Sequence, residues 1–272
     1  MKISSDLRQR GNKVSFLLVL TVLVLSQASV AQTATPVFAR VIAQKVPAGK
    51  EQEFEKFMND VMKPVHQLRK QKGKIINWYF FKVHFTGAND AYNYVAVHYY
   101  NSWSNTEDKE QWGELMKEAN PKADVAAQSA KMRELRTVVS NQLYYRQAAI
   151  DPKTPANFKY VTIDFMKVKP GMASEYMKVE DEWKPFHQHL ADNGKAGGWG
   201  LWSVIFPGGS SGSHDFVTSS RYSNYAQLGE LDYAATMKAV YPSKDLQTIF
   251  DHAEKSRDLV RSELWELIAG LQ

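Results

Sequence analysis

The sequence predicts an α+β protein made of two consecutive copies of one β-α-β-β-α-β unit. The first observation is a repeated phrase: residues 63–78 read KPVHQLRKQKGKIINW, and residues 184–199 read KPFHQHLADNGKAGGW. His66 and His187 hold the same place in the two phrases and are 121 positions apart. The second observation is that similar strand-like and helix-like patterns flank both phrases at nearly the same spacing. Self-similarity at a fixed period indicates a repeated structural unit.

Each copy opens with a strand, which we place at 38–46 in the first copy and 158–168 in the second. A turn with Pro and Gly follows, and then apolar residues recur at steps of three and four, the period of an amphipathic helix. In the first copy these residues are Phe54, Phe57, Met58, Val61, Val65 and Leu68. A glycine, Gly73 or Gly194, is expected to end the helix, because glycine tolerates the left-handed conformation found there.

The first helix of copy one carries an extra residue. Gly49 and Lys63 are 14 positions apart, whereas their counterparts Gly171 and Lys184 are 13 positions apart. A single inserted residue inside a helix is typical of a π-bulge, which often lies near a functional site. We therefore predict a π-bulge just before Lys63, in the first copy alone.

Three further strands complete each copy. The second strand is rich in aromatic residues, as strands often are, and a polar loop joins it to the third. A helical stretch broken by Pro121 or Pro242 comes next, and a fourth strand closes the unit. The predicted second, third and fourth strands span 74–85, 92–100 and 138–147, and in the second copy 197–206, 215–222 and 262–270. This order is the ferredoxin-like pattern.

The N-terminal residues are predicted to form a secretory signal peptide. Four basic residues precede the apolar run VSFLLVLTVLVL, and small Ser29 and Ala31 suit a cleavage site before Gln32. We therefore expect a periplasmic or secreted protein. The predicted organisation is a signal peptide at 1–31, a first ferredoxin-like repeat at 32–150, a linker at 151–157 and a second repeat at 158–272.

Composition narrows the possible functions. The 272-residue chain has a formal net charge of +5, and removal of residues 1–31, with four Lys or Arg and one Asp, leaves +2. So weak a charge argues against nucleic-acid binding. No apolar stretch after the signal peptide is long enough to span a membrane. The absence of cysteine excludes disulfides, a thiolate nucleophile and a cysteine zinc site.

Several of these motifs together resemble the NIPSNAP and antibiotic-biosynthesis-monooxygenase group. They are the V-x-x-G-x-x-x-E-[FY] turn and helix start, the K-P-x-H phrase with the G-K and Trp after it, and the closing aromatic strand. That group belongs to the dimeric α/β-barrel superfamily, in which two ferredoxin-like units pack together. The resemblance covers both halves and implies an intramolecular, pseudo-dimeric α/β barrel, in a chain that is a monomer or a homodimer.

His66 and His187 are the candidate catalytic residues. Each lies in the first helix of its copy, and a helical wheel places His187 on the buried side, near Trp183 and Leu190. Such a histidine is either a core residue bonded to a backbone carbonyl, or a general base or haem ligand whose pKa burial has lowered. His187 and His189 are two positions apart on a helix, too far round to share a metal ion, and we predict no metal site.

A second group of candidates lies on strands. Apolar positions such as Val41 and Ile163 are assigned to the helix-facing side, so Arg40 and Asp164, at alternate positions, are expected to face the barrel interior. Aromatic residues would wall a partly polar cavity there, although they would equally well fill the barrel. The predicted ligand-binding residues are Arg40, Trp78, Tyr100, Asp164, Trp199 and Tyr222.

Two other patterns are expected to be structural. Residues 208–212 match G-x-S-x-G, but a strand follows them where a nucleophile elbow needs a helix, so we predict a hairpin loop. His84 and His98 lie on neighbouring strands and have Phe206 and Ser220 as counterparts. We expect both histidines at the surface or at the barrel rim.

The sequence favours an exported protein whose fused barrel binds a small hydrophobic or planar molecule, with no cofactor predicted. One alternative, implied by the resemblance, is a cofactor-free or haem-dependent monooxygenase-like enzyme that uses His187 or His66 as base or ligand. Another is a non-catalytic accessory or interaction protein. No Gly-rich phosphate loop is found.

Overall fold

The structure is a computed structural model that describes residues 35–107, 109–152 and 157–271. The predicted signal peptide and most of the predicted linker lie outside the described residues. None of the helices in the described ranges is both long enough and apolar enough to cross a membrane.

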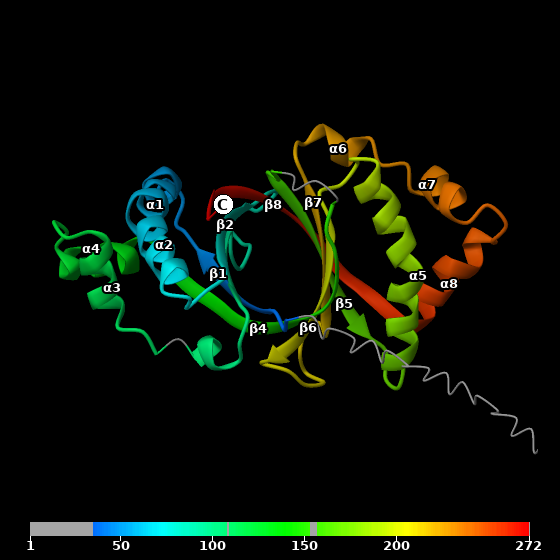
Figure 1. Cartoon of the computed structure of the whole chain (residues 1–272), viewed down its shortest axis with the longest axis horizontal. Coiled ribbons are helices and arrows are strands. Elements are labelled where there is room, and N and C mark those ends of the chain that lie inside the picture. The colour runs from blue at the N-terminus through cyan, green and yellow to red at the C-terminus, as the bar shows by residue number, and fades with distance from the viewer. Residues whose placement is uncertain (1–34, 108, 153–156, 272) are drawn as a thin grey trace, which may run out of the picture. The chain divides into compact units, whose positions relative to one another are not determined.

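The first half of the chain forms strands and helices in the predicted order (Figure 1). Its strands are β1 (Phe38–Lys45), β2 (Asn77–Val83), β3 (Tyr94–Tyr100) and β4 (Thr137–Ile150). Its helices are α1 (Glu51–Phe57), the π-helix η1 (Met58–Met62), α2 (Lys63–Gln71), the 3₁₀-helix η2 (Ser104–Glu107), α3 (Trp112–Ala119) and α4 (Val125–Leu135).

The second half repeats this order. Its strands are β5 (Tyr160–Val168), β6 (Trp199–Phe206), β7 (Phe216–Tyr222) and β8 (Arg257–Gly270). Its helices are α5 (Ala173–Asp192), α6 (Ala226–Gly229), α7 (Tyr233–Val240) and α8 (Leu246–Ser256).

The eight strands close into one antiparallel barrel in the order β1-β3-β2-β8-β5-β7-β6-β4. Within the two halves the order is equivalent, β4-β1-β3-β2 and β8-β5-β7-β6. The halves meet twice, where β2 pairs with β8 and where β4 pairs with β6. Closure leaves no strand with a free edge. The predicted α+β class and the barrel are therefore confirmed.

The last strand of each half is long because it pairs with both halves. In β4, residues 137–145 pair with β1 and residues 143–150 pair with β6. In β8, residues 257–266 pair with β5 and residues 265–270 pair with β2. The predicted fourth strands were shorter, since local patterns do not reveal a second partner.

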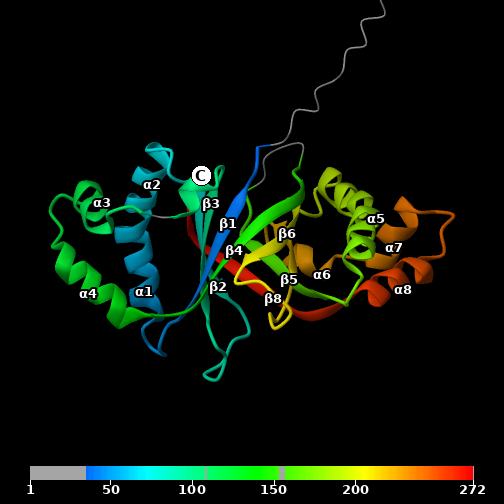
Figure 2. The same ribbon diagram turned by 90° about the horizontal axis from the view of Figure 1, so that it is seen from below.

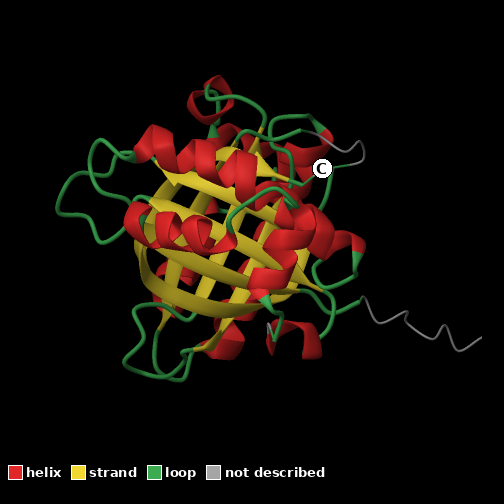
Figure 3. Cartoon of the chain, turned by 90° about the vertical axis from the view of Figure 1, so that its left-hand side faces the viewer, coloured by secondary structure: helices red, strands yellow, loops and turns green. Residues whose placement is uncertain are grey.

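Helices cover the outside of the barrel, with α1–α4 over the strands of the first half and α5–α8 over those of the second (Figures 1 and 2). Figure 3 looks onto the first-half helices, with the barrel strands behind them. Equivalent aspartates begin α4 and α8. Asp124 accepts a hydrogen bond from the backbone N of Ala127 at 3.0 Å, and Asp245 accepts one from Gln247 at 3.0 Å, which stabilises each helix start.

The predicted π-bulge is confirmed. The five residues before Lys63 form the π-helix η1, whereas α5 runs as one α-helix with Pro185 inside it. Gly73 and Gly194 follow these helices with φ angles of +67° and +66°, as their predicted role requires. The extra residue is thus absorbed within the first-half helix, before the repeated phrase begins.

Most strands are covered on both faces, apart from the exposed first parts of β4 and β8. The inner faces form one apolar cluster: Ala39, Ala43, Phe81, Val83, Val95, Val97, Tyr144, Val161, Ile163, Phe165, Val217 and Trp265. The outer faces pack against the helices, where Phe54 contacts Phe80 and Tyr94, for example. A strand covered on both sides has no polar face to mark its orientation.

The predicted orientation of the first strands is therefore wrong. Val41 and Ile163 line the barrel interior, and Arg40 and Asp164, at the alternate positions, lie on the helix side. Because side chains alternate with a period of exactly two residues, one incorrect assignment reverses every position of a strand.

Candidate functional site

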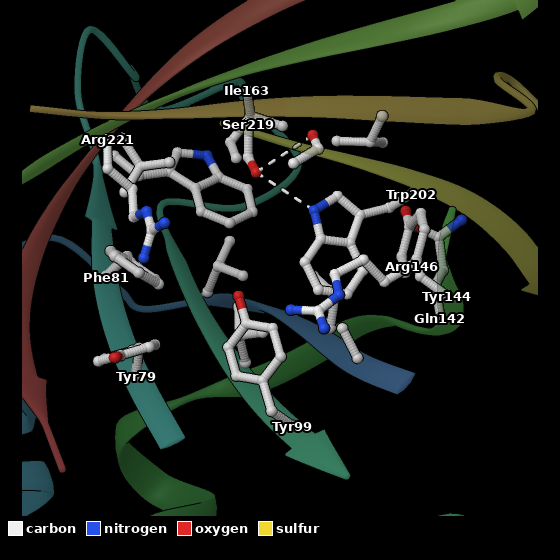
Figure 4. Close-up of a pocket in the computed structure, with 18 of the residues that line it drawn as sticks. Tyr79, Phe81, Tyr99, Gln142, Tyr144, Arg146, Ile163, Trp202, Ser219 and Arg221 are labelled. Carbon is white, nitrogen blue, oxygen red and sulfur yellow. Dashed lines mark hydrogen bonds between the residues drawn. The ribbon is translucent and has the colours of Figure 1, made fainter. Parts of the chain in front are cut away.

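A cavity of about 320 Å³ lies inside the barrel and is open to solvent. This volume is at the lower end of the range for small-molecule sites, roughly 300–1,000 Å³. Aliphatic residues form much of its wall: Ala39, Val41, Ala43, Val95, Val97, Val161, Ile163 and Val217. Aromatic residues add flat surfaces: Phe158 and Trp265, and, labelled in Figure 4, Tyr79, Phe81, Tyr99, Tyr144 and Trp202. The space therefore suits a small planar or apolar molecule.

Two arginines reach the cavity at one end. The Arg221 Nη2 atom is 2.6 Å from Oδ1 of Asp151, so this guanidinium is paired. Arg146 lies opposite Trp202 in the pairing of β4 with β6. Its guanidinium makes no hydrogen bond or ion pair with any residue that the structure describes. Figure 4 shows Arg146 and Tyr99 pointing toward the same space.

The Tyr99 hydroxyl lies in the field of both arginines. Burial raises the pKa of Tyr99 above its ordinary value of 10.0, and the nearby Tyr79 raises it further. Arg221 and Arg146 act in the opposite direction, which shows that both charges lie close to the ring. The phenol keeps its proton at neutral pH and can donate a hydrogen bond to an acceptor in the cavity.

The other end of the cavity holds a third arginine whose charge is balanced. Arg261 Nε is 2.8 Å from Oε1 of Glu263, and Arg261 Nη2 donates to the Tyr92 hydroxyl at 2.8 Å. The guanidinium lies 4.0 Å from the ring centroid of Phe165. The charge at this end is therefore neutralised within the wall.

A buried histidine supports the wall behind Tyr144. His214 Nε2 is 2.8 Å from the Tyr144 hydroxyl, and His214 Nδ1 is 2.9 Å from Oγ of Ser213. Burial, helped by the charge of Arg261, lowers the pKa of His214 to about 4. The neutral ring can accept from Ser213 and donate to Tyr144, which in turn donates to Gln142 at 2.8 Å. The neighbouring loop, residues 208–212, is the predicted hairpin between β6 and β7.

Gly200 shapes the cavity by having no side chain. A Cβ atom there would lie 2.8 Å from Nε1 of Trp202 and 3.2 Å from Oγ of Ser219. Its absence lets the indole lie across the strand and donate to Ser219 at 3.2 Å (Figure 4). A glycine inside a strand often marks such a close approach. The sequence WGLW carries this signal, because its glycine stands inside a predicted strand.

A second cavity, of about 310 Å³, lies outside the barrel between the first-half helices and the sheet. His66 of α2 stacks on Trp78 of β2, with ring centroids 4.4 Å apart and planes at 20°. The ring centroid of His66 is also 4.8 Å from that of His98 of β3 and 5.7 Å from that of Trp112 of α3. Methionines and arginines complete much of the lining: Met58, Met62, Met116, Met132, Arg133 and Arg136.

The two imidazoles of this cleft are buried and neutral. Burial lowers the pKa of His66 well below 6.5, and His98 and Arg69 lower it further. Burial and the charges of Arg69 and Arg40 likewise lower the pKa of His98. An interaction with the backbone of Arg40 raises this pKa, but by less. Among the described residues, neither His66 Nδ1 nor either ring nitrogen of His98 has a partner at full hydrogen-bond geometry.

The expected place of His98 is therefore wrong. It is 6% exposed and lies beneath the helices rather than at the surface or the rim, because its position on β3 points to the helix side. His84 is partly exposed, and its Nε2 atom is 2.8 Å from Oε2 of Glu266.

The stack of histidine on tryptophan recurs in the second half and explains the repeated phrase. His187 of α5 lies on Trp199 of β6, with centroids 4.8 Å apart and planes at 15°. Burial lowers the pKa of His187 to about 3. Ser220 takes the place of His98 in the second half. It lies opposite Trp199 in the pairing of β6 with β7, just as His98 lies opposite Trp78 in the pairing of β2 with β3. Each half has its own stack between helix and sheet, but the imidazole pair belongs to the first half.

The prediction that six residues wall the barrel cavity is wrong for five of them. The helix side of the sheet carries Arg40, Trp78, Tyr100, Asp164 and Tyr222. Trp199 borders the barrel cavity, but its ring stacks on His187. The structure does bring His66 and Trp78 together, in the cleft. The polar groups that face the barrel interior, Arg146 and Tyr99 among them, were not singled out by the sequence analysis.

The sequence matches no family model and no curated protein. Similar solved structures include a protein described as a candidate monooxygenase from Fusobacterium nucleatum subsp. nucleatum, with 10% identity and a TM-score of 0.55, covering 88% of this chain and 94% of that chain. A candidate chlorite dismutase is 11% identical, with a TM-score of 0.49 over 86% of this chain and 96% of that chain. An anthrone oxidase-like protein is 9% identical, with a TM-score of 0.46, and the match covers 87% of this chain and 93% of that chain.

At such low identity, these comparisons bear on the fold alone. The monooxygenase-like structure is the one with a TM-score above 0.5 among these three, and it spans both halves of the chain. By fold, the chain is a mixed α+β protein with a closed eight-stranded antiparallel barrel, consistent with the dimeric α/β-barrel fold.

Proposed function

We propose that the chain is an exported small-molecule-binding protein in which two fused ferredoxin-like units, 32–150 and 158–272, share one barrel. The equivalent strand order of the halves and the 121-residue offset of the repeated phrase support the tandem arrangement. The N-terminal pattern of basic residues, an apolar run and small residues supports export to the periplasm or the medium. Both halves of the barrel are supplied by one chain, so a monomer suffices for binding.

The observation that carries the binding function is the barrel cavity. Protein interiors are close-packed and rarely leave voids much larger than a water molecule. The barrel interior instead holds a space of about 320 Å³ that is open to solvent, so a small molecule can enter it. With aliphatic residues around it and aromatic faces beside it, the cavity suits a planar molecule of one or two rings.

A neutral two-ring probe, 2-naphthamide, tests this proposal by isothermal titration calorimetry with residues 32–272. We expect saturable binding with one site per chain. Ala39→Phe should abolish it, because the new ring occupies the cavity from β1. Ala126→Phe, at an exposed position of α4, is the matched control and should bind normally. Thermal unfolding verifies that each variant is folded, and Val41→Phe replaces Ala39→Phe if that variant does not fold.

Two results would count against the barrel as the site. Binding that survives both filling variants would mean that the probe binds elsewhere. No binding to the wild-type protein at millimolar probe would reject neutral two-ring molecules as ligands of the barrel.

A monooxygenase-like activity is the second candidate, and the His66–His98 pair favours it. A neutral buried imidazole can take a proton from a bound substrate. It can also bind the iron of a haem, which would supply redox chemistry there. Arg133 and Arg136 suit the carboxylates of such a group. The donor set therefore fits, although the cleft of about 310 Å³ would need its flexible methionines to move.

A haem titration followed at the Soret band tests the haem-dependent form of this candidate. We expect a saturable shift that is lost in His66→Ala and retained in His187→Ala, the equivalent histidine without its own imidazole partner. A folded protein with no shift at micromolar haem would remove haem from consideration. A shift that His66→Ala leaves unchanged would mean that His66 is not the ligand.

A further inference from the structure

The barrel wall carries three arginines, and two of them have acidic partners. Arg221 is paired with Asp151, and Arg261 is paired with Glu263. Arg146 has no such partner among the residues that the structure describes. An arginine guanidinium keeps its positive charge at any ordinary pH. The wall therefore presents one uncompensated positive charge to the cavity, at the end where Arg146 lies.

Three kinds of group converge at this end of the cavity. Arg146 extends from the inner face of β4, opposite Trp202 on β6. Figure 4 shows the Trp202 indole, the Arg146 guanidinium and the Tyr99 ring around one space. The effect of Arg146 on Tyr99 indicates that the cation lies near the phenol. A charge, a hydroxyl donor and a flat apolar surface are thus available to one molecule.

The charge decides which ligands fit. A cation would be repelled by Arg146. A neutral molecule would displace water from the guanidinium without supplying a negative charge to pair with it, which costs free energy. A carboxylate can accept two parallel hydrogen bonds from a guanidinium, the strongest geometry available to that group. A neutral phenol can donate a further bond to the same carboxylate.

We infer that the barrel takes an aromatic carboxylate of one or two rings, with its carboxylate on Arg146 and Tyr99 and its ring against Trp202. This inference rests on the proposed function, because it names the class of molecule that the barrel binds. The paired arginines, Arg221 and Arg261, act as fixed parts of the wall.

Two probes of nearly the same shape test the inference, because 2-naphthoate differs from 2-naphthamide by one negative charge. The affinity of each probe is measured by calorimetry for wild type, Arg146→Gln, Arg146→Lys and Lys122→Gln. Lys122 is an exposed lysine between α3 and α4 and serves as the control for net charge. We expect wild type to bind naphthoate at least about tenfold more tightly than naphthamide.

The variants separate charge from shape. Arg146→Gln should remove the preference for naphthoate by weakening the binding of naphthoate, without weakening that of naphthamide, whereas Arg146→Lys should keep part of the preference. Lys122→Gln should bind both probes as wild type does. Should Arg146→Gln not fold, Tyr99→Phe takes its place and should weaken the binding of naphthoate alone, severalfold.

The outcomes distinguish the inference from the proposed function. Equal wild-type affinity for the two probes, or a preference that survives Arg146→Gln, overturns the inference and leaves small-molecule binding standing. Absence of binding for both probes rejects the proposed function, and the inference with it.

Discussion

The interface between helix and sheet can be compared in the two halves position by position, because the two histidine–tryptophan stacks are equivalent. In the first half, the helix contains a π-helix, and His66 lies beside His98 and a cleft of about 310 Å³. In the second half, the helix is regular, Ser220 replaces the second histidine, and His187 lines none of the cavities described above.

The second half buries acidic groups instead. Glu180 of α5 is 4% exposed, and burial raises its pKa to about 7, against the opposing effects of Tyr176 and Arg257. Burial also raises the pKa of Asp164, whose carboxylate accepts a hydrogen bond from Ser262. The shared histidine and tryptophan therefore pack the helix against the sheet in both halves. The residues that differ, such as His98 and Glu180, determine which polar groups are buried at each interface.

The largest expected effect tests the shared part of the comparison. Trp78 and Trp199 are 0% and 3% exposed, and each supports a histidine. Changing either tryptophan to alanine should lower the free energy of unfolding by about 3–5 kcal/mol, because a large buried ring is lost and a cavity remains. Urea denaturation of both variants measures this. A loss below about 1 kcal/mol for one of them would mean that the two stacks are not equivalent.

The next effect tests the acidic interface of the second half through pH. Unfolded Glu180 ionises near pH 4.5 and the folded residue near 7, so the folded state retains a proton that the unfolded state loses. The contribution of Glu180 is therefore full below about pH 4.5 and is lost as pH rises to about 7, by up to about 3 kcal/mol. Glu180→Gln should flatten the dependence of stability on pH and stabilise the protein at pH 8.

Denaturation midpoints between pH 4.5 and 8 measure the effect of Glu180→Gln. Glu254→Gln, at an exposed position of α8, is the control and should keep the wild-type profile. A profile for Glu180→Gln that is parallel to the wild-type profile would contradict a buried, protonated carboxyl group.

The smallest effect separates the two histidines. His187→Ala should cost about 1–3 kcal/mol at pH 7.5, because a packed ring is removed. His66→Ala should cost more, because His66 is 2% exposed and its ring packs against three others, whereas His187 is only partly buried. As pH falls below about 6.5, the unfolded imidazole gains a proton that His187 in the folded protein, with a pKa of about 3, does not. The stability that neutral His187 contributes is then progressively lost, and the cost of His187→Ala should shrink.

Thermal unfolding at pH 7.5 and pH 5 compares His66→Ala and His187→Ala directly. Equal losses for the two variants at pH 7.5 would show that the deeper burial of His66 makes no energetic difference between the halves.

Local signals in the sequence sufficed for the order of elements. The 14-residue spacing from Gly49 to Lys63, against 13 in the second copy, located the π-helix, because one extra residue must be accommodated within a helix. Gly73 and Gly194 marked the helix ends, because each adopts a positive φ. The repeated phrase also identified His66 and His187 as related positions, although it did not reveal that each stacks on a tryptophan.

Only the tertiary structure decided which face of each strand lines the barrel. Alternation along β1 separates Arg40 from Val41, but helices cover one side and the other strands of the barrel surround the other. Both faces are therefore covered, and the polar residues of β1 do not mark the face that lines the barrel.

The candidate site was likewise decided by the tertiary structure. Tyr99, Arg146 and Trp202 come from three strands, and the pairing of β4 with β6 brings two of them opposite each other. By itself, the sequence determined the elements, their order and their repetition, because these depend on neighbours in the chain. The cavity and its uncompensated charge depend on residues far apart in the chain, whose contacts are set when the barrel closes.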